Sequence, residues 1–177
     1  ISFNGNLMRL ISLKLKNFRQ HADTQIYFEP GITIVVGDNG TGKSTLLEAV
    51  SWAIYGTEAA RSTKDTIMWN KAEKNAKNSG EKVKVSAELV FAMENETYRV
   101  VRELGKAELF HGKTEAPIAI SQAEVTKKLI SIIGMTRTEF FNTYFTGQKE
   151  LSFLANMQPT EKKLFINKIL DYEKIRT

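Results

Sequence analysis

A glycine-rich segment, residues 37–44, constrains the fold of this chain more than any other feature. It reads Gly-Asp-Asn-Gly-Thr-Gly-Lys-Ser and matches G-x-x-x-x-G-K-[ST] at every fixed position. The preceding run, residues 32–36, is rich in β-branched side chains and predicts a strand buried on both faces. The residues after it carry apolar side chains at helical spacing and predict a helix that ends near Gly56: Leu46, Leu47, Val50 and Ile54. This order of strand, loop and helix predicts an α/β fold with a phosphate-binding loop.

The residue types of this loop suit a nucleoside triphosphate. Glycines let backbone N–H groups curl around phosphate oxygens, and the helix N-terminus adds a partial positive charge. Lys43 would place a compact cation on the β- and γ-phosphates, and Ser44 would offer a hydroxyl to Mg²⁺. The sequence therefore predicts ATP and Mg²⁺ as cofactors, with these residues binding them: Gly37, Asn39, Gly40, Thr41, Gly42, Lys43, Ser44 and Thr45.

Two further patterns limit the reaction. Residues 70–73 approach the guanine-reading pattern N-K-x-D but end in Glu, and no D-x-x-G occurs, so GTP is excluded as the nucleotide. An ATPase also needs an acidic residue at the end of another buried strand. Residues 87–91 come nearest, but Glu88 lies inside an alternating strand. The chain therefore carries half of an ATPase site, and the other half must come from another segment or another chain.

Composition narrows the class of protein. A chain of 177 residues fits one ordinary domain, and 42% hydrophobic with 25% charged residues excludes a disordered or fibrous protein. No apolar run approaches the ~18 residues of a membrane span, and no signal peptide is visible. The absence of cysteine excludes a disulfide and a thiolate zinc site. A net charge of +5 is compatible with nucleic acid as a partner.

Hydrophobic periodicity predicts the remaining elements. Alternation indicates a strand from Met8 and another over 24–28, then a meander of strands over 83–91, 98–103, 109–110 and 118–120. Capping boxes at Ser121-x-x-Glu124 and Thr136-x-x-Glu139 predict two helices, the first ending at Gly134. We expect a further helix from about Thr160 to Thr177, a long surface excursion over 57–82, and a cloning remnant in residues 1–7.

Four segments together resemble a known family. Residues 13–19 (Leu-x-Leu-x-Asn-Phe-Arg), the strand 31–36 and the loop with Asn39 are similar to the N-terminal lobe of SMC-like ABC ATPases. Residues 140–154, which contain Tyr-Phe-Thr-Gly-Gln148, resemble that family's Q-loop. Within the superfamily, the chain from Met8 to Thr177 most resembles the SbcC and Rad-fifty group of DNA double-strand-break repair ATPases.

The resemblance implies an architecture and a set of partners. We expect an α/β lobe over residues 8–158, a mixed sheet with an antiparallel meander and C-terminal helices, and the start of a coiled coil over 159–177. The partners implied are the C-terminal lobe of the same protein, a second head in a homodimer, an SbcD or Mre-eleven type nuclease, and double-stranded DNA, with no membrane. The location would be the cytoplasm, at the nucleoid, in a prokaryote, or the nucleus in a eukaryote.

The resemblance also implies roles for particular residues. Lys43 and Gln148 would be catalytic, Gln148 would join Ser44 at Mg²⁺, and Arg19 would reach the phosphates or the ribose. Residues Met68, Trp69 and Asn70 would lie against the base, although Trp69 also fits a small satellite core. Arg19 and Gln148 also fit ordinary surface side chains. Basic residues of the meander and the next helix are candidate DNA contacts or an ordinary solvated face: Arg99, Arg102, Lys106, Lys113, Lys127 and Lys128.

Three functions stay open. The first is an ATP-driven DNA-repair clamp, in which ATP joins two heads and hydrolysis releases them. The second is another SMC-like ATPase, in chromosome condensation or recombination mediation, which predicts a hinge domain where the repair branch predicts a zinc hook. The third is either a binding module with a dead nucleotide pocket or a P-loop kinase. A kinase would need a substrate lid.

Overall fold

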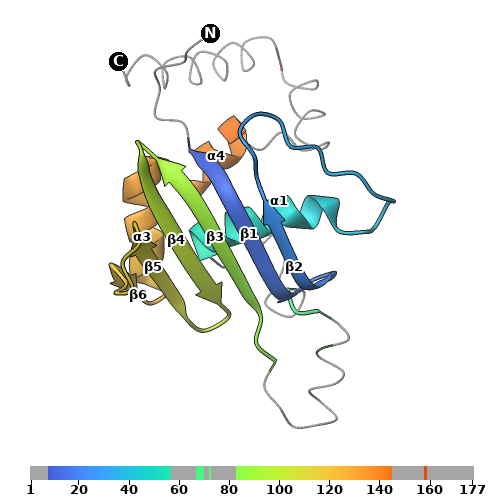
Figure 1. The fold of residues 1–177 in the computed structure, drawn as a ribbon, viewed down its shortest axis with the longest axis horizontal. Coiled ribbons are helices and arrows are strands. Elements are labelled where there is room, and N and C mark those ends of the chain that lie inside the picture. Colours follow the sequence, from blue (N-terminus) through green and yellow to red (C-terminus); the bar gives the residue numbers. More distant parts are fainter. Residues whose placement is uncertain (1–7, 57–66, 70–71, 73–82, 145–157, 159–177) are drawn as a thin grey trace. The chain divides into compact units, whose positions relative to one another are not determined.

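A computed structural model describes residues 8–56, 67–69, 72, 83–144 and 158, without the side chains of 141–144. The chain divides into two compact units, Met8–Gly134 and a second that includes Met135–Thr177. The first unit carries the sheet and two helices (Figure 1). The described part of the second unit is mainly one short helix, α4 (Arg137–Tyr144).

Six antiparallel strands form a single sheet in the first unit. They are β1 (Arg9–Phe18), β2 (His21–Tyr27), β3 (Ser86–Met93), β4 (Glu96–Glu103), β5 (Ala107–His111) and β6 (Ala119–Ile120). Their order across the sheet is β2-β1-β3-β4-β5-β6, and every pairing is antiparallel. The predicted meander over 83–120 is therefore confirmed.

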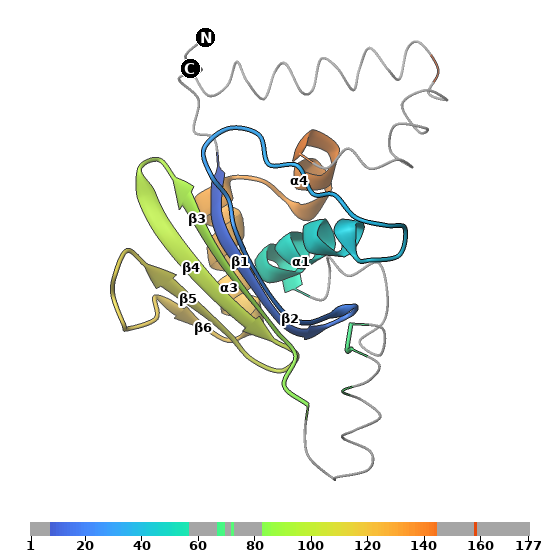
Figure 2. The same cartoon turned by 45° about the vertical axis from the view of Figure 1, so that its right-hand side comes forward.

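Alternation along the strands decides which face of the sheet is covered. In β3, Ala87, Leu89 and Phe91 are buried, and the residues between them are more exposed. Helices α1 (Lys43–Tyr55) and α3 (Gln122–Ile133) lie on this apolar face, as Figure 2 shows, and they also contact one another. Trp52 and Leu129 extend the core from the helices. The opposite face carries polar and charged side chains, which is typical of an antiparallel sheet with one solvated side.

The local helix signals act as predicted. Ser121 caps α3 by accepting a hydrogen bond from the Glu124 N–H at 3.3 Å, and Gly134 ends the helix in the left-handed conformation. The second capping box is reciprocal, because the Glu139 carboxylate accepts from the Thr136 N–H at 2.8 Å while Thr136 Oγ1 accepts from the Glu139 N–H at 3.4 Å. Both helices therefore begin where their capping residues predict.

The predicted strand over residues 32–36 is not part of the sheet. Figure 1 shows this segment as an irregular connection between β2 and α1, with Ile32, Ile34 and Val36 exposed by 78–93%. The prediction was wrong for these residues because a strand needs a neighbour to receive its backbone hydrogen bonds, and no described strand lies beside it. The sequence predicts a mixed sheet because residues 32–36 would add a parallel strand. Without that strand, every pairing among the described strands is antiparallel. Leu47 of α1, predicted on the apolar face, is also exposed.

Several predictions lie outside the described residues. These are the remnant 1–7, nearly all of the excursion 57–82, the Q-loop beyond Tyr144, and the helix 160–177 with its coiled coil. Across the part of the chain that is described, no helix has the length and apolar character needed to cross a bilayer.

Candidate functional site

The glycine-rich loop leads directly into the N-terminus of α1. Gly40 and Gly42 have φ of 84° and 99°, conformations that favour glycine. The Asp38 carbonyl accepts hydrogen bonds from the Thr41 hydroxyl at 2.8 Å and the Thr41 N–H at 3.4 Å, which closes a turn. Helix α1 has no side-chain cap at Gly42 and no acidic residue in its first turn. Its first N–H groups and its positive dipole end therefore suit an anion.

Lys43 lies across this loop. Its Nζ donates hydrogen bonds of 2.7 Å to the carbonyl oxygens of both Gly37 and Asp38, which are six and five residues earlier. The ammonium group is thus held at the mouth of the loop by two neutral acceptors. Ser44, the next residue, is exposed at the start of α1, so its hydroxyl is available to a ligand. The ammonium group of Lys43 and the hydroxyl of Ser44 are chemically suited to a phosphate chain that carries a magnesium ion.

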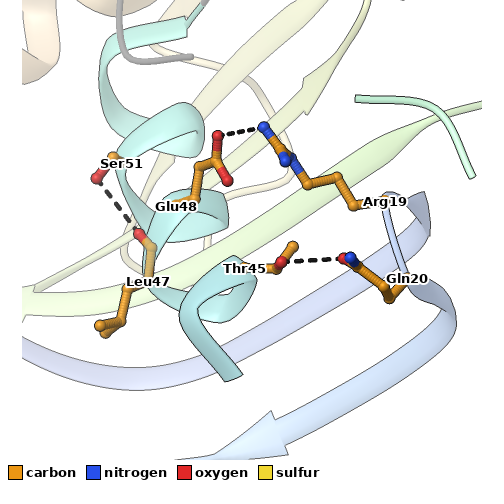
Figure 3. A network of polar contacts seen from close by, with 6 residues as sticks. All are labelled: Arg19, Gln20, Thr45, Leu47, Glu48 and Ser51. Carbon is orange, nitrogen blue, oxygen red and sulfur yellow. Dashed lines mark hydrogen bonds and ion pairs between the residues drawn. The ribbon is translucent and has the colours of Figure 1, made fainter. Parts of the chain in front are cut away.

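The β1–β2 turn, taken as Arg19 and Gln20 with His21 at the start of β2, contacts α1 and its N-cap residue through three successive side chains. Arg19 pairs with Glu48 at 2.6 Å, and Gln20 Oε1 accepts from the Thr45 hydroxyl at 3.0 Å (Figure 3). His21 Nε2 lies 3.2 Å from the Gly42 carbonyl oxygen. The helix residues contacted are three apart in sequence and so share one side of α1. The turn is therefore fastened along the first two turns of the helix that follows the loop.

Sequence reasoning identified only Arg19 among these turn residues. Gln20, His21 and Glu48 were missed because their roles depend on how the hairpin packs against the helix. One signal was present: Thr45 and Glu48 are three residues apart and polar, on a helix whose other positions are mostly apolar.

Residues 67–69 lie beside the end of β1. The Arg19 N–H donates to the Ile67 carbonyl at 2.7 Å, and the Trp69 N–H donates to the Asn17 carbonyl at 2.9 Å. An isolated bridge pairs Phe18 with Met68. The structure therefore brings Met68 and Trp69 next to Arg19, although the sequence separates them by about fifty residues. Asn70 and Gln148 lie outside the described residues.

One of the candidate DNA contacts is wrong. The Arg102 side chain is fully buried and donates to the Ala53 carbonyl at 2.9 Å, to the Ile54 carbonyl at 3.1 Å and to the Thr126 hydroxyl at 3.1 Å, and it also bonds Gln122. Burial lowers the pKa of this guanidinium to about 10. A side chain that caps the last carbonyls of α1 cannot reach a phosphate backbone.

The other basic candidates remain predictions. Arg99 is half-buried, and its guanidinium lies 3.9 Å from the centre of the Phe110 ring. Lys106 pairs with Glu108 at 2.9 Å, and this carboxylate raises the pKa of Lys106. Exposed side chains make up the rest of the set: Lys113, Lys127 and Lys128.

Comparisons with known proteins agree with this geometry. The model of the AAA domain family matches residues 12–176. The chain is 32% identical over 167 residues to the DNA double-strand break repair Rad50 ATPase of Methanocaldococcus jannaschii, covering 92% of this chain and 15% of that protein. It is 30% identical over 174 residues to the protein of the same name from Methanococcus maripaludis, covering 94% and 16%.

The chain thus spans about one sixth of the length of these relatives. The family match extends from the middle of β1 through the loop and α1 to nearly the last residue, so it includes every candidate site residue named above. The chain therefore belongs to the AAA domain family, and its recognition as the N-terminal ATPase lobe of the SbcC and Rad50 group is confirmed.

Proposed function

We propose that the chain is the ATP-binding and hydrolysing half of a head in a DNA double-strand-break repair complex. The observation that carries the proposal is the glycine-rich loop at the uncapped N-terminus of α1, with the Lys43 ammonium held across it by two carbonyl oxygens. Relatives named as Rad50 ATPases support the repair process in which the head acts.

The chemistry assigned to the loop follows from these contacts. ATP with Mg²⁺ supplies a phosphoanhydride that water cleaves. Lys43 exchanges its two neutral acceptors for phosphate oxygens, which are stronger partners because the hydrogen bonds become charge-assisted. Its charge then stabilises the negative charge that develops on the transferred phosphoryl group. The proposal assigns Mg²⁺ to Ser44 and Gln148, which would hold it together, and the phosphates or the ribose to Arg19.

The proposal assigns the second half of the site to a C-terminal lobe of the same protein. The apolar segment 32–36 supports this assignment, because its exposed Ile32, Ile34 and Val36 side chains suit burial against a further strand. Two such heads form a homodimer around ATP, and the dimer controls binding of double-stranded DNA and of an SbcD or Mre-eleven type nuclease. Such a complex works at the nucleoid or in the nucleus. The corresponding lobe of another SMC-like ATPase is the alternative.

The test is the rate of Mg²⁺-dependent ATP hydrolysis by the chain, alone and mixed with the C-terminal lobe of its own full-length protein. We expect no measurable hydrolysis by the chain alone. Activity on mixing should rise more steeply than the first power of protein concentration, because two composite heads must meet. Robust hydrolysis by the 177 residues alone would contradict a split site. Hydrolysis by the mixture in simple proportion to concentration would contradict head dimerisation.

A further inference from the structure

Two side chains of the β1–β2 turn form hydrogen bonds to the residues on either side of Lys43 and Ser44. His21 contacts the Gly42 carbonyl oxygen, immediately before this pair of residues, at 3.2 Å. Gln20 contacts the Thr45 hydroxyl, immediately after it, at 3.0 Å. Figure 3 shows the second of these contacts, with Gln20 directed at the first turn of α1. The two residues that the proposed function assigns to the phosphates and to Mg²⁺ are therefore bracketed by contacts from a single turn.

The contact of His21 defines how its imidazole is protonated when neutral. A carbonyl oxygen only accepts hydrogen bonds, so Nε2 must carry the hydrogen that points at Gly42. Nδ1 then accepts from the Thr24 hydroxyl, which lies 3.0 Å away on β2. Thr24 thereby orients the ring from one side while the ring holds the backbone of the loop on the other.

The carbonyl of Gly42 is the first acceptor of the helix. It also receives the N–H groups of Thr45 at 3.0 Å and Leu46 at 3.3 Å, which start the hydrogen-bond ladder of α1. The approach of the ring is close: a Cβ placed on Gly42 would lie 2.8 Å from His21 Nε2 and 3.4 Å from the Gln20 Cβ. The loop and the turn therefore fit together with no room for a side chain at this position.

The other end of the loop has no comparable support among the described residues. The segment 32–36 that leads into it pairs with no described strand and is exposed. The end of the loop that enters α1 is hydrogen-bonded to the β1–β2 turn, so this is the end that the sheet holds in place. We propose that Gln20 and His21 are positioning residues, which fix the start of α1 so that Lys43 faces the phosphates and Ser44 faces Mg²⁺. This inference rests on the proposed function, because it takes the loop to be the nucleotide site.

The test compares matched variants of the chain. His21→Gln keeps a donor at the place of Nε2, whereas His21→Asn keeps only a group near Nδ1. Gln20→Met removes the acceptor for Thr45, and Gln25→Met is the same substitution on the exposed side of β2, where Gln25 contacts Tyr27. The dissociation constant of Mg·ATP is measured by calorimetry, and amide hydrogen exchange of Thr45 and Leu46 by NMR.

We expect His21→Asn and Gln20→Met each to weaken Mg·ATP binding about three- to tenfold, the size of one net hydrogen bond. Exchange at Thr45 and Leu46 should accelerate by a similar factor, because the start of α1 opens more readily. His21→Gln and Gln25→Met should stay within about twofold of the parent. Should His21→Asn fail to fold, Thr24→Val removes the partner that orients the ring and should shift both quantities in the same direction.

The outcomes separate the two proposals. If the parent binds Mg·ATP and His21→Asn, Gln20→Met and Thr24→Val match it in affinity and exchange, the positioning role is wrong and the nucleotide site stands. Equal losses in His21→Gln and His21→Asn would also overturn the role, since the donor at Nε2 would not matter. If Lys43→Ala binds Mg·ATP as well as the parent does, the proposed function fails, and the positioning role fails with it.

Discussion

Arg19 and Glu48 form an ion pair of 2.6 Å that joins the β1–β2 turn to the second turn of α1. The two side chains are only 22% and 18% exposed, so the pair is shielded from water more than an ordinary surface pair. Shielding strengthens the attraction between the charges, and a hydrogen bond between two charged groups adds to it. The pair is therefore a measurable link between the sheet and the helix that follows the glycine-rich loop.

A double-mutant cycle with Arg19→Met and Glu48→Gln measures this link. We expect a coupling free energy of about 1 kcal/mol in urea unfolding, at the upper end for pairs that are partly exposed. The matched control is Lys84 with Glu103, a pair at 2.8 Å whose lysine is 63% exposed. A cycle on that pair should give less than about 0.5 kcal/mol. Equal coupling in the two cycles would contradict the shielding argument.

Replacing Arg102 with Met should strongly destabilise the fold. The substitution removes the donors for two carbonyl oxygens at the end of α1 and for two side chains near the start of α3. Buried acceptors left without donors cost roughly 1–3 kcal/mol each, with some recovery by relaxation. We expect the free energy of unfolding to fall by about 3–5 kcal/mol, measured by urea denaturation.

Arg99→Met is the control for this loss. Arg99 lies on the same strand, but it packs over Phe110 on the other face of the sheet. Its replacement should cost less than about 1 kcal/mol, since a contact of this kind at a half-exposed site is weak. If both substitutions cost the same, the capping role of Arg102 is wrong.

Tyr98 should make the stability of the fold fall at alkaline pH. Burial raises the pKa of its phenol above 10.0, and the charges of Glu96 and Glu94 raise it further. The unfolded chain then loses the proton at a lower pH than the folded chain does. The stabilisation from the neutral phenol is therefore complete below about pH 10 and is lost as pH rises through the raised pKa.

Free energies of unfolding of the parent and Tyr98→Phe check this expectation between about pH 9 and about pH 11. The parent should lose stability relative to the variant across this range. The lowered pKa of Arg102 acts in the opposite direction, because its neutral form favours the folded state, but it is common to both proteins and cancels in the difference. A difference that does not change with pH would contradict the assignment.

Local signals predicted most of the fold. Ser121 and Gly134 mark the ends of α3 through contacts within a few residues, so a sequence pattern suffices to place them. The alternation along β4 also indicates that the Arg102 side chain is buried, because Val100 and Arg102 lie on the same face of the strand and Val100 is buried. The basic character of Arg102 led to the wrong interpretation, although the period of two indicated an inward side chain.

Tertiary relationships account for what could not be predicted. The run 32–36 has the composition of a buried strand, but composition does not supply the neighbouring strand that would bury it. Gln20 and His21 carry no motif, and their contacts arise only when the hairpin packs against α1. The position of Met68 and Trp69 beside Arg19 depends on a bridge between residues about fifty positions apart, which no local pattern indicates.

The affinity of the chain for Mg·ATP, with and without the Lys43 ammonium, tests the central claim most directly. We expect the parent to bind and Lys43→Ala to bind at least about 100-fold more weakly, since a charge-assisted contact to the phosphates is lost. Lys14→Ala, which removes an exposed lysine from the open face of the sheet, should leave the dissociation constant within about twofold. Equal affinity of the parent and Lys43→Ala would contradict the nucleotide site.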